Sequence, residues 1–176
     1  SSKVIISKQK KIVKKKIKKK IKNLKNNKFF FGENFKLIKI NQKSFCFKYN
    51  NKKINFTRPY LRGDHQIENA ITAIMAVLQI KKIGKKISII SINRALNKTR
   101  WPGRLEKGYL KNIPVYLDGA HNIDGSKEIA KYFIKNSLNR WMIIGMLKNK
   151  DLTNYLLIVK KIIKGVIAIK IPGEKN

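Results

Sequence analysis

Asp118, His121 and Asn122 place a carboxylate, an imidazole and an amide within five residues of one another. Asp118 can accept hydrogen bonds from a ribose hydroxyl or an ammonium group, His121 can exchange a proton near neutral pH, and Asn122 can both donate and accept. The same residue types are common in turns, and Asp124 could simply cap a following helix. From the spacing alone, a ligand site and a strand-to-helix turn are equally good interpretations.

Two further positions offer chemistry that suits a nucleotide. Arg104 stands between Gly103 and Leu105, and a guanidinium beside a glycine can fork closely onto phosphate oxygens. Asn69 follows His65 in a predicted helix, where its amide can contact an adenine edge. The alternatives are an exposed arginine and a local backbone hydrogen bond. No G-x-x-x-x-G-K-[S/T] phosphate loop occurs in the 176 residues, and no Cys/His cluster has metal-ligand spacing. No metal-ligating residue is therefore predicted.

The elements around residues 118–122 alternate between strands and helices. This pattern predicts an α/β unit with a parallel, three-layer sheet whose apolar strands are buried on both faces. Residues 118–122 follow the first predicted strand, at the edge of the sheet where ligands bind in open α/β folds. The predicted order is a strand and loop at 113–120, a helix at 125–137, a strand at 140–147, a helix at 151–164 and a strand at 165–171.

Before residue 99 the pattern differs, and we place a domain boundary there, with domains 1–98 and 99–176. Residues 3–7 form a short apolar strand, and 8–25 a lysine-rich helix with Val13, Ile17, Ile21 and Leu24 on one face. Residues 35–58 alternate as antiparallel strands, in which Cys46 is expected to be buried. Two helices follow, one from about residue 66 to 80 and one at 87–99, for which Ser88 is the predicted cap. The first is expected to bury Ile67, Ala70, Ile71, Ile74, Val77 and Leu78.

The charge balance is extreme, with 42 Lys and Arg against 9 Asp and Glu, a formal net charge of +33. Such an excess is typical of nucleic-acid or acidic-surface binding. However, Lys, Ile and Asn, all with A/T-rich codons, are abundant along the whole chain, which favours a compositional bias. We therefore interpret the lysines of 8–25 as a solvated helix face. The single cysteine excludes an intrachain disulfide, and no membrane-spanning stretch or signal peptide is found, so a cytoplasmic location is expected.

Three motifs occur in order: GDHQIENAITAI at 63–74, WPGRLE at 101–106 and LDGAHNIDGSKE at 117–128. Together they resemble the bifunctional folylpolyglutamate synthase/dihydrofolate synthase family of the Mur-ligase superfamily. GMLKNKD at 145–151 resembles the G-M-x-x-K-D segment of that family. A peptidoglycan Mur ligase is an alternative within the superfamily, although the HQIENA and GRLE motifs favour the folate branch. A basic nucleic-acid-binding module is the alternative from another class.

The resemblance implies an ATP-dependent ligase that joins L-glutamate to dihydropteroate or folate through an acyl phosphate. Asn69, Arg104 and Asp118 would bind ATP, and His121 and Asn122 would hold glutamate, with Asp118 and His121 as the catalytic pair. The implied fold is the end of a central ATP-binding domain at 1–98, made of antiparallel strands and helices. A truncated, Rossmann-like C-terminal domain with a parallel sheet follows at 99–176. Mg²⁺ and its ligands, with the phosphate loop, would lie upstream of this chain.

The resemblance also implies how the chain would behave. We expect a full-length form that is a monomer, with ATP, glutamate and a folate as partners and no nucleic acid or membrane partner. We expect this chain to be a partial protein that does not turn over ATP by itself.

Overall fold

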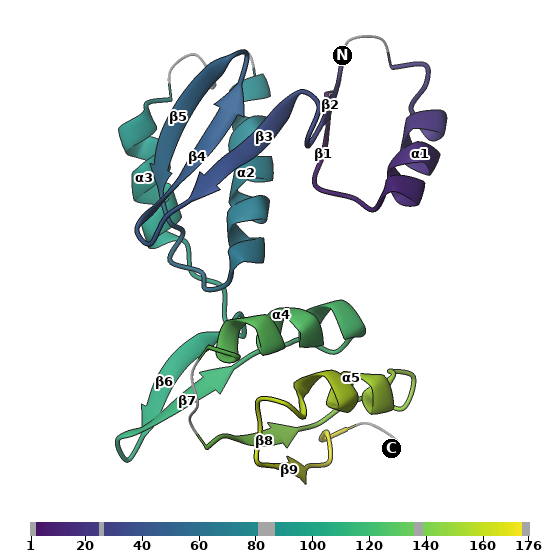
Figure 1. Cartoon of the computed structure of the whole chain (residues 1–176), viewed down its shortest axis with the longest axis vertical. Coiled ribbons are helices and arrows are strands. Elements are labelled where there is room, and N and C mark those ends of the chain that lie inside the picture. The colour runs from purple at the N-terminus through teal and green to yellow at the C-terminus, as the bar shows by residue number, and fades with distance from the viewer. Residues whose placement is uncertain (1–2, 25–26, 81–86, 136–138, 174–176) are drawn as a thin grey trace. The chain divides into compact units, whose positions relative to one another are not determined.

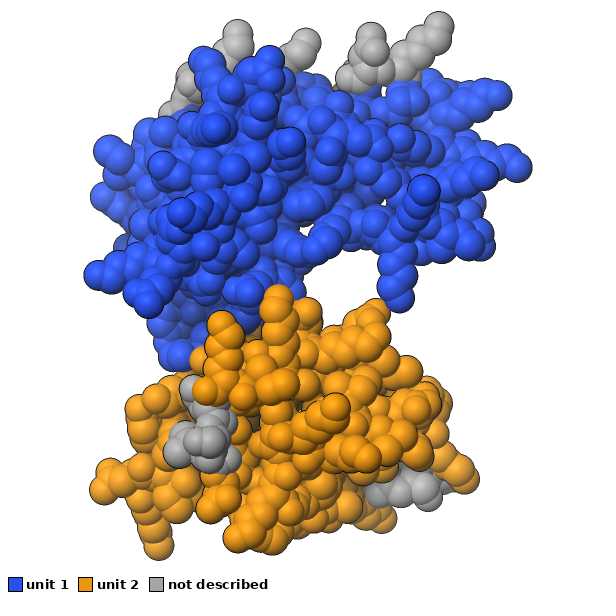
Figure 2. All heavy atoms as spheres, in the orientation of Figure 1, with its two compact units in different colours: residues 1–101 blue, residues 102–176 orange. Residues whose placement is uncertain are grey.

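The computed structural model of the chain describes residues 3–24, 27–80, 87–135 and 139–173. The chain divides into two compact units, Ser1–Trp101 and Pro102–Asn176 (Figure 2), which we call unit 1 and unit 2. Among the described residues, no helix is both long enough and apolar enough to cross a membrane.

Unit 1 contains a parallel pair of short strands, a three-stranded antiparallel sheet and three helices (Figure 1). In the sheet, β4 lies between β3 and β5. The Asn50–Asn51 turn joins β4 to β5 with φ angles of 47° and 59°, which suit a tight two-residue hairpin. The elements of unit 1 are β1 (Val4–Ile6), α1 (Lys11–Lys20), β2 (Lys28–Phe30), β3 (Phe35–Ile40), β4 (Ser44–Tyr49), β5 (Lys52–Thr57), α2 (Asp64–Gln79) and α3 (Ile89–Lys98).

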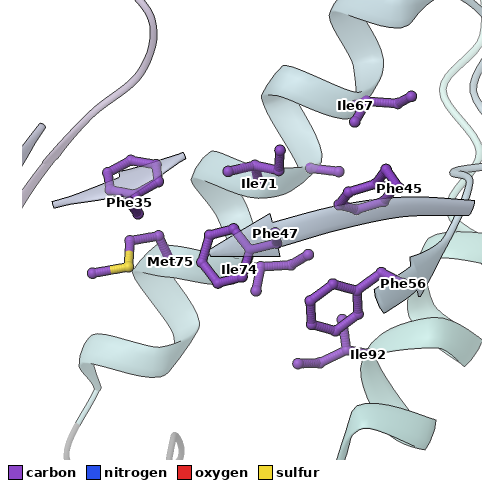
Figure 3. Packing of buried hydrophobic residues seen from close by; sticks show 10 residues of the cluster. Phe35, Phe45, Phe47, Phe56, Ile67, Ile71, Ile74, Met75 and Ile92 are labelled. Atoms are coloured by element: carbon purple, nitrogen blue, oxygen red, sulfur yellow. The ribbon is translucent and has the colours of Figure 1, made fainter. Parts of the chain in front are cut away.

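The core of unit 1 forms where alternate side chains of the antiparallel sheet meet α2 (Figure 3). Phe45 and Phe47 point to this side because side chains alternate along a strand, and both are fully buried. Cys46, between them, is only half-buried, so the predicted burial of its thiol is wrong. α2 buries Ile67, Ala70, Ile71 and Ile74 as predicted, and Met75 in addition. Val77 and Leu78, also predicted to be buried, are only half-buried.

α3 and α1 differ in how well their ends are defined. Ser88 caps α3 as predicted, because its Oγ accepts the Ser91 N–H at 3.0 Å. α1 has no side-chain cap and buries no residue. It is shorter than the predicted helix at 8–25, because no described side chain caps its N-terminus and its lysines repel one another. Lys25, at the end of that prediction, lies outside the described residues.

Unit 2 combines an antiparallel hairpin with a parallel strand pair and two helices (Figure 1). In the parallel pair, Trp141 stands opposite Gly165, and a Cβ at Gly165 would lie 2.5 Å from the Trp141 ring, so the glycine makes room for the indole. The elements of unit 2 are β6 (Glu106–Leu110), β7 (Ile113–Leu117), α4 (Ile123–Phe133), β8 (Trp141–Ile144), α5 (Leu152–Val159) and β9 (Gly165–Ala168).

The predicted α/β class is confirmed, but two details of unit 2 differ. β6 was not predicted, although Lys111 and Asn112 make a two-residue left-handed turn between β6 and β7 with φ angles of 45° and 66°. The strands are not buried on both faces. In β8, Met142 and Ile144 pack toward the core while Trp141 and Ile143 are exposed, and most residues of β7 and β9 are exposed. α4 and α5 both contribute to a single core. Residues 136–137 of the predicted helix lie outside the described residues.

Candidate functional site

Asp118 joins the two predicted loops of unit 2 through the main chain. Its Oδ2 accepts the N–H of Leu105 and its Oδ1 accepts the N–H of Ala120, both at 2.8 Å. A backbone bond runs in parallel, from the N–H of Gly119 to the carbonyl of Gly103 at 2.8 Å. The P-G-R and D-G-A-H-N motifs are therefore held side by side. Asp118 is half-buried, and carboxylates that accept backbone N–H groups make strong, oriented bonds.

The P-G-R turn has an unusual backbone on both sides of Arg104. Gly103 has a φ of 68° and Leu105 a φ of 46°. A left-handed conformation is costly for a residue such as leucine, and it persists only where surrounding contacts impose it. The side chain of Leu105 is buried in the unit 2 core, and its N–H is bound by Asp118. These contacts present Arg104, which is exposed, at the tip of a constrained turn.

His121 has one ring nitrogen committed and one available. Its Nδ1 lies 3.0 Å from the carbonyl oxygen of Gly119, and a carbonyl can only accept, so Nδ1 carries the proton. In the neutral ring, Nε2 then offers a lone pair, and in the cation it offers a second N–H. The residue is exposed. His121 can thus accept or donate a hydrogen bond at Nε2.

Asn122 is the N-cap of α4. Its Oδ1 accepts the N–H of Gly125 at 2.8 Å, which leaves the side-chain NH₂ as the group available to a ligand. The alternative that Asp124 caps this helix is wrong, because Asp124 lies inside the first turn. Gly125 allows the turn to close, since a Cβ there would lie 2.6 Å from the Cβ of Ala120.

Asn69 is the one predicted site residue that belongs to unit 1. It is exposed on α2, and its Nδ2 donates to Oε1 of Gln66 at 3.2 Å. Gln66 is buried and also lies 2.9 Å from Nε2 of His65. The side-chain Oδ1 of Asn69 has no hydrogen-bond partner within the described ranges, so it can still accept a hydrogen bond from a ligand. Unit 2 brings Arg104, Asp118, His121 and Asn122 together.

Tyr155 is a neighbour of Asp118 that the sequence did not single out. Burial raises the pKa of Tyr155 to about 12, and the charge of Asp118 contributes to the same shift. The side chain lies in the unit 2 core with Leu105. Tyr155 therefore stays protonated beside the carboxylate. Its place in α5, at the apolar spacing of the helix, marks it only as a core residue.

The GMLKNKD segment at 145–151 leads into α5. Asp151 caps this helix, with Oδ1 accepting the N–H of Asn154 at 3.1 Å and Oδ2 accepting its side-chain Nδ2 at 2.7 Å. These two bonds to Asn154 lower the pKa of Asp151. No group of three His, Cys, Asp or Glu side chains within the described ranges is placed to hold a metal ion.

Two curated proteins match the chain in sequence, while no family model matches it. The chain is 35% identical over 115 residues to the dihydrofolate synthase/folylpolyglutamate synthase of Bacillus subtilis, a match that covers 64% of this chain and 26% of that protein. It is 33% identical over 89 residues to the dihydrofolate synthetase of Saccharomyces cerevisiae, covering 46% of this chain and 21% of that one. The chain thus spans about a quarter of the length of these relatives.

Solved structures match over a larger part of the chain. The folylpolyglutamate synthase of Thermotoga maritima has a TM-score of 0.76 and 20% identity, covering 100% of this chain and 44% of that one. A bifunctional folylpolyglutamate synthase/dihydrofolate synthase with Mn, AMPPNP and L-glutamate bound has a TM-score of 0.71 and 17% identity. This match covers 86% of this chain and 35% of that one. The resemblance read from the motifs is therefore confirmed, and the chain is similar in sequence and in fold to part of the folylpolyglutamate synthase/dihydrofolate synthase family.

Proposed function

We propose that this chain is part of an ATP-dependent ligase that joins L-glutamate to dihydropteroate or folate. The observation that carries the proposal is the pairing of the P-G-R and D-G-A-H-N loops through Asp118. This pairing sets a guanidinium and an imidazole on one constrained surface of unit 2. The similarity to named dihydrofolate and folylpolyglutamate synthases supports the same reaction class.

The reaction has two steps. The terminal phosphoryl group of ATP passes to the substrate carboxylate, which gives an acyl phosphate and ADP. The amine of glutamate then attacks the acyl carbon, the amide bond forms, and inorganic phosphate leaves. A guanidinium that binds the phosphoryl oxygens offsets the charge that develops during transfer, and the exposed Arg104 would serve in this role. Asn69 would contact the nucleotide base.

The loop after β7 would bind both the glutamate and the nucleotide. Asp118 would contribute mainly by holding the Arg104 turn in place, and it would contact the nucleotide through the free lone pairs of its two oxygens. Nε2 of His121 and the amide NH₂ of Asn122 would bind the carboxylates of glutamate. Nε2 of His121 can donate to a carboxylate only in the cationic ring, because Nδ1 carries the single proton of the neutral ring.

Mg²⁺ commonly accompanies ATP and neutralises phosphate charge when it is bound. Following the family resemblance, we propose that the Mg²⁺ ligands lie outside this chain. The phosphate loop, which does not occur in the 176 residues, is proposed to lie outside this chain as well. The chain is thus proposed to be a partial protein that supplies one side of the reaction site.

A direct experiment tests this division. The chain alone, mixed with dihydropteroate, glutamate and Mg·ATP, should release no phosphate above background. Phosphate release by the isolated chain that is lost in Asp118→Ala would contradict the proposal.

A chimera tests the reaction itself. The segment of the Bacillus subtilis enzyme that this chain matches would be replaced by the corresponding residues of this chain. We expect phosphate release that depends on both glutamate and the pteroate substrate, and a large loss in the Arg104→Ala chimera. A folded chimera that uses another amino acid instead of glutamate would indicate a different Mur-type ligase, and a folded chimera that binds ATP without any ligation would overturn the assignment.

A further inference from the structure

α1 is the most basic element among the described residues. Seven of its ten residues are lysine, its first turn contains no acid, and none of its residues is buried. It lies beside β1 and β2, apart from the core that the antiparallel sheet makes with α2 (Figure 1). α1 therefore presents most of its circumference to solvent.

One side of α1 is anchored to the rest of unit 1. Lys14 and Lys18 both reach Oε1 of Glu33, with Nζ–O distances of 2.7 and 2.8 Å. The same two ammonium groups lie over the ring of Phe30, at 5.6 and 5.1 Å from its centroid. Glu33 is thus paired with Lys14 and Lys18 on the anchored side.

The opposite side carries four lysines that form a compact group, which we call the α1 quartet: Lys15, Lys16, Lys19 and Lys20. At 3.6 residues per turn, the pairs 15/19 and 16/20 each lie one turn apart, about 6 Å along the axis. All four are exposed, and none has an ion pair with any described residue. Like charges at this spacing repel one another, so the quartet is a site of unrelieved positive charge.

We propose that the α1 quartet binds the phosphate backbone of a nucleic acid. Closely spaced ammonium groups match a chain of phosphates, and binding would relieve the repulsion within the quartet. α1 contains no aromatic residue on which a base could stack, so the binding is expected to be independent of base sequence. This inference departs from the sequence-based expectation of no nucleic-acid partner, and it does not rest on the proposed ligase function.

The exposed apolar residues of α1 argue against a membrane surface as the partner. Helices that lie in a membrane interface bury a broad apolar face, usually with Trp, Phe or Leu. The exposed apolar side chains of α1 are Ile12, 68% exposed, and Val13, 37% exposed. That face is too narrow to anchor the helix in a bilayer, whereas phosphate contacts need only the lysines.

The experiment compares two variants with the same change in net charge. In one, the quartet is replaced by Lys15→Gln, Lys16→Gln, Lys19→Gln and Lys20→Gln. In the control, the replacements are Lys36→Gln, Lys39→Gln, Lys52→Gln and Lys53→Gln, at exposed positions spread over β3 and β5. Circular dichroism establishes that both variants keep the helix content of the parent chain. Binding is measured by fluorescence anisotropy with a fluorescein-labelled duplex and with a single strand of arbitrary sequence.

Four phosphate contacts predict that the affinity for the duplex falls about a hundredfold when the salt concentration rises from about 50 to about 200 mM. The quartet variant should lose most of this salt dependence and bind at least about tenfold more weakly at the lower salt concentration, while the control keeps the behaviour of the parent chain. Equal weakening in both variants would overturn the proposal, since net charge alone would then explain binding. Absence of binding by the parent chain, or binding only to vesicles that contain phosphatidylglycerol, would also overturn it.

Discussion

The main-chain N–H of Leu105 donates to the carboxylate of Asp118 over 2.8 Å, thirteen residues further along the chain, and this bond connects two motifs together with the backbone bond from Gly119 to Gly103. The other carboxylate oxygen binds the N–H of Ala120. Asp118 therefore stabilises the conformation of both loops without a ligand. Its contribution to stability and its contribution to ligand binding can be separated experimentally.

Replacement of Asp118 should destabilise unit 2. Asp118→Ala leaves the N–H groups of Leu105 and Ala120 without their acceptor, and each unpaired, partly buried group costs about 1–3 kcal/mol. Asp118→Asn retains one oxygen and should cost less. Urea unfolding measures the change. The control is Asp124→Ala, which removes only an exposed contact to Lys127 at 3.4 Å, and an equal loss of stability in both alanine variants would contradict the structural role of Asp118.

Arg104→Ala should leave stability nearly unchanged, because the guanidinium is exposed and makes no hydrogen bond or ion pair with the described residues. In the chimeric ligase described above, the same change should mainly lower kcat, because phosphate charge develops during transfer. Arg104→Lys keeps the charge but not the fork, so only partial activity should return. Steady-state kinetics with saturating glutamate provide the measurement, and unchanged kcat and kcat/KM would rule out a phosphate contact.

Gly125→Ala tests the close approach of α4 to the D-G-A-H-N loop. The added Cβ would lie 2.6 Å from Cβ of Ala120, so the loop must move, at a cost of about 1–3 kcal/mol. Gly108→Ala in β6 is the matched control, because a Cβ there meets nothing within 4 Å. Thermal unfolding distinguishes the two. The double variant Ala120→Gly/Gly125→Ala should recover part of the loss, and failure to do so would point to a different cause.

The stability of unit 2 should fall at high pH through Tyr155. Its folded pKa of about 12 lies above its ordinary value of 10.0, so the phenol ionises in the unfolded chain before it ionises in the folded one. The stabilisation is fully present below pH 10 and is lost as the pH rises through about 12, an effect of at most about 3 kcal/mol. Unfolding by urea at several pH values should show this loss, and Tyr155→Phe should lose less stability over the same interval.

The attachment of α1 should weaken in acid. Hydrogen bonds from Lys14 and then Lys18 lower the pKa of Glu33 below its ordinary value of 4.5. The stabilisation is therefore present above pH 4.5 and is lost as the pH falls through the lower folded pKa. NMR signals of Phe30 and α1 should shift over this interval in the parent chain. In Glu33→Gln they should be independent of pH there, and an identical titration in that variant would exclude Glu33 as the cause.

Buried residues are predicted best from the sequence where a helix packs a regularly spaced apolar face against a single core. The apolar spacing of α2 identified four of its buried residues, and Ser88 was identified as a cap from its type and position. Cys46 was misplaced because alternation alone does not say which face of a strand is buried, and the two flanking phenylalanines decided it.

The candidate site was predictable in its residues but not in its contacts. Motif order identified Arg104, Asp118 and His121, whereas the bonds from Asp118 to backbone N–H groups depend on how two loops meet. Such contacts leave no residue pattern, since a backbone N–H is present at nearly every position. β6 escaped prediction because its residues do not alternate between apolar and polar types, and the left-handed Lys111–Asn112 turn contains no glycine.

The packing of Trp141 over Gly165 has a spectroscopic consequence. The chain contains two tryptophans, Trp101 and Trp141, so Trp101→Phe leaves one indole, which stands on β8 opposite β9. Its emission then depends on the pairing of these two strands. Excitation of a single tryptophan can thus follow the formation and loss of the parallel strand pair in unit 2 as a separate optical signal.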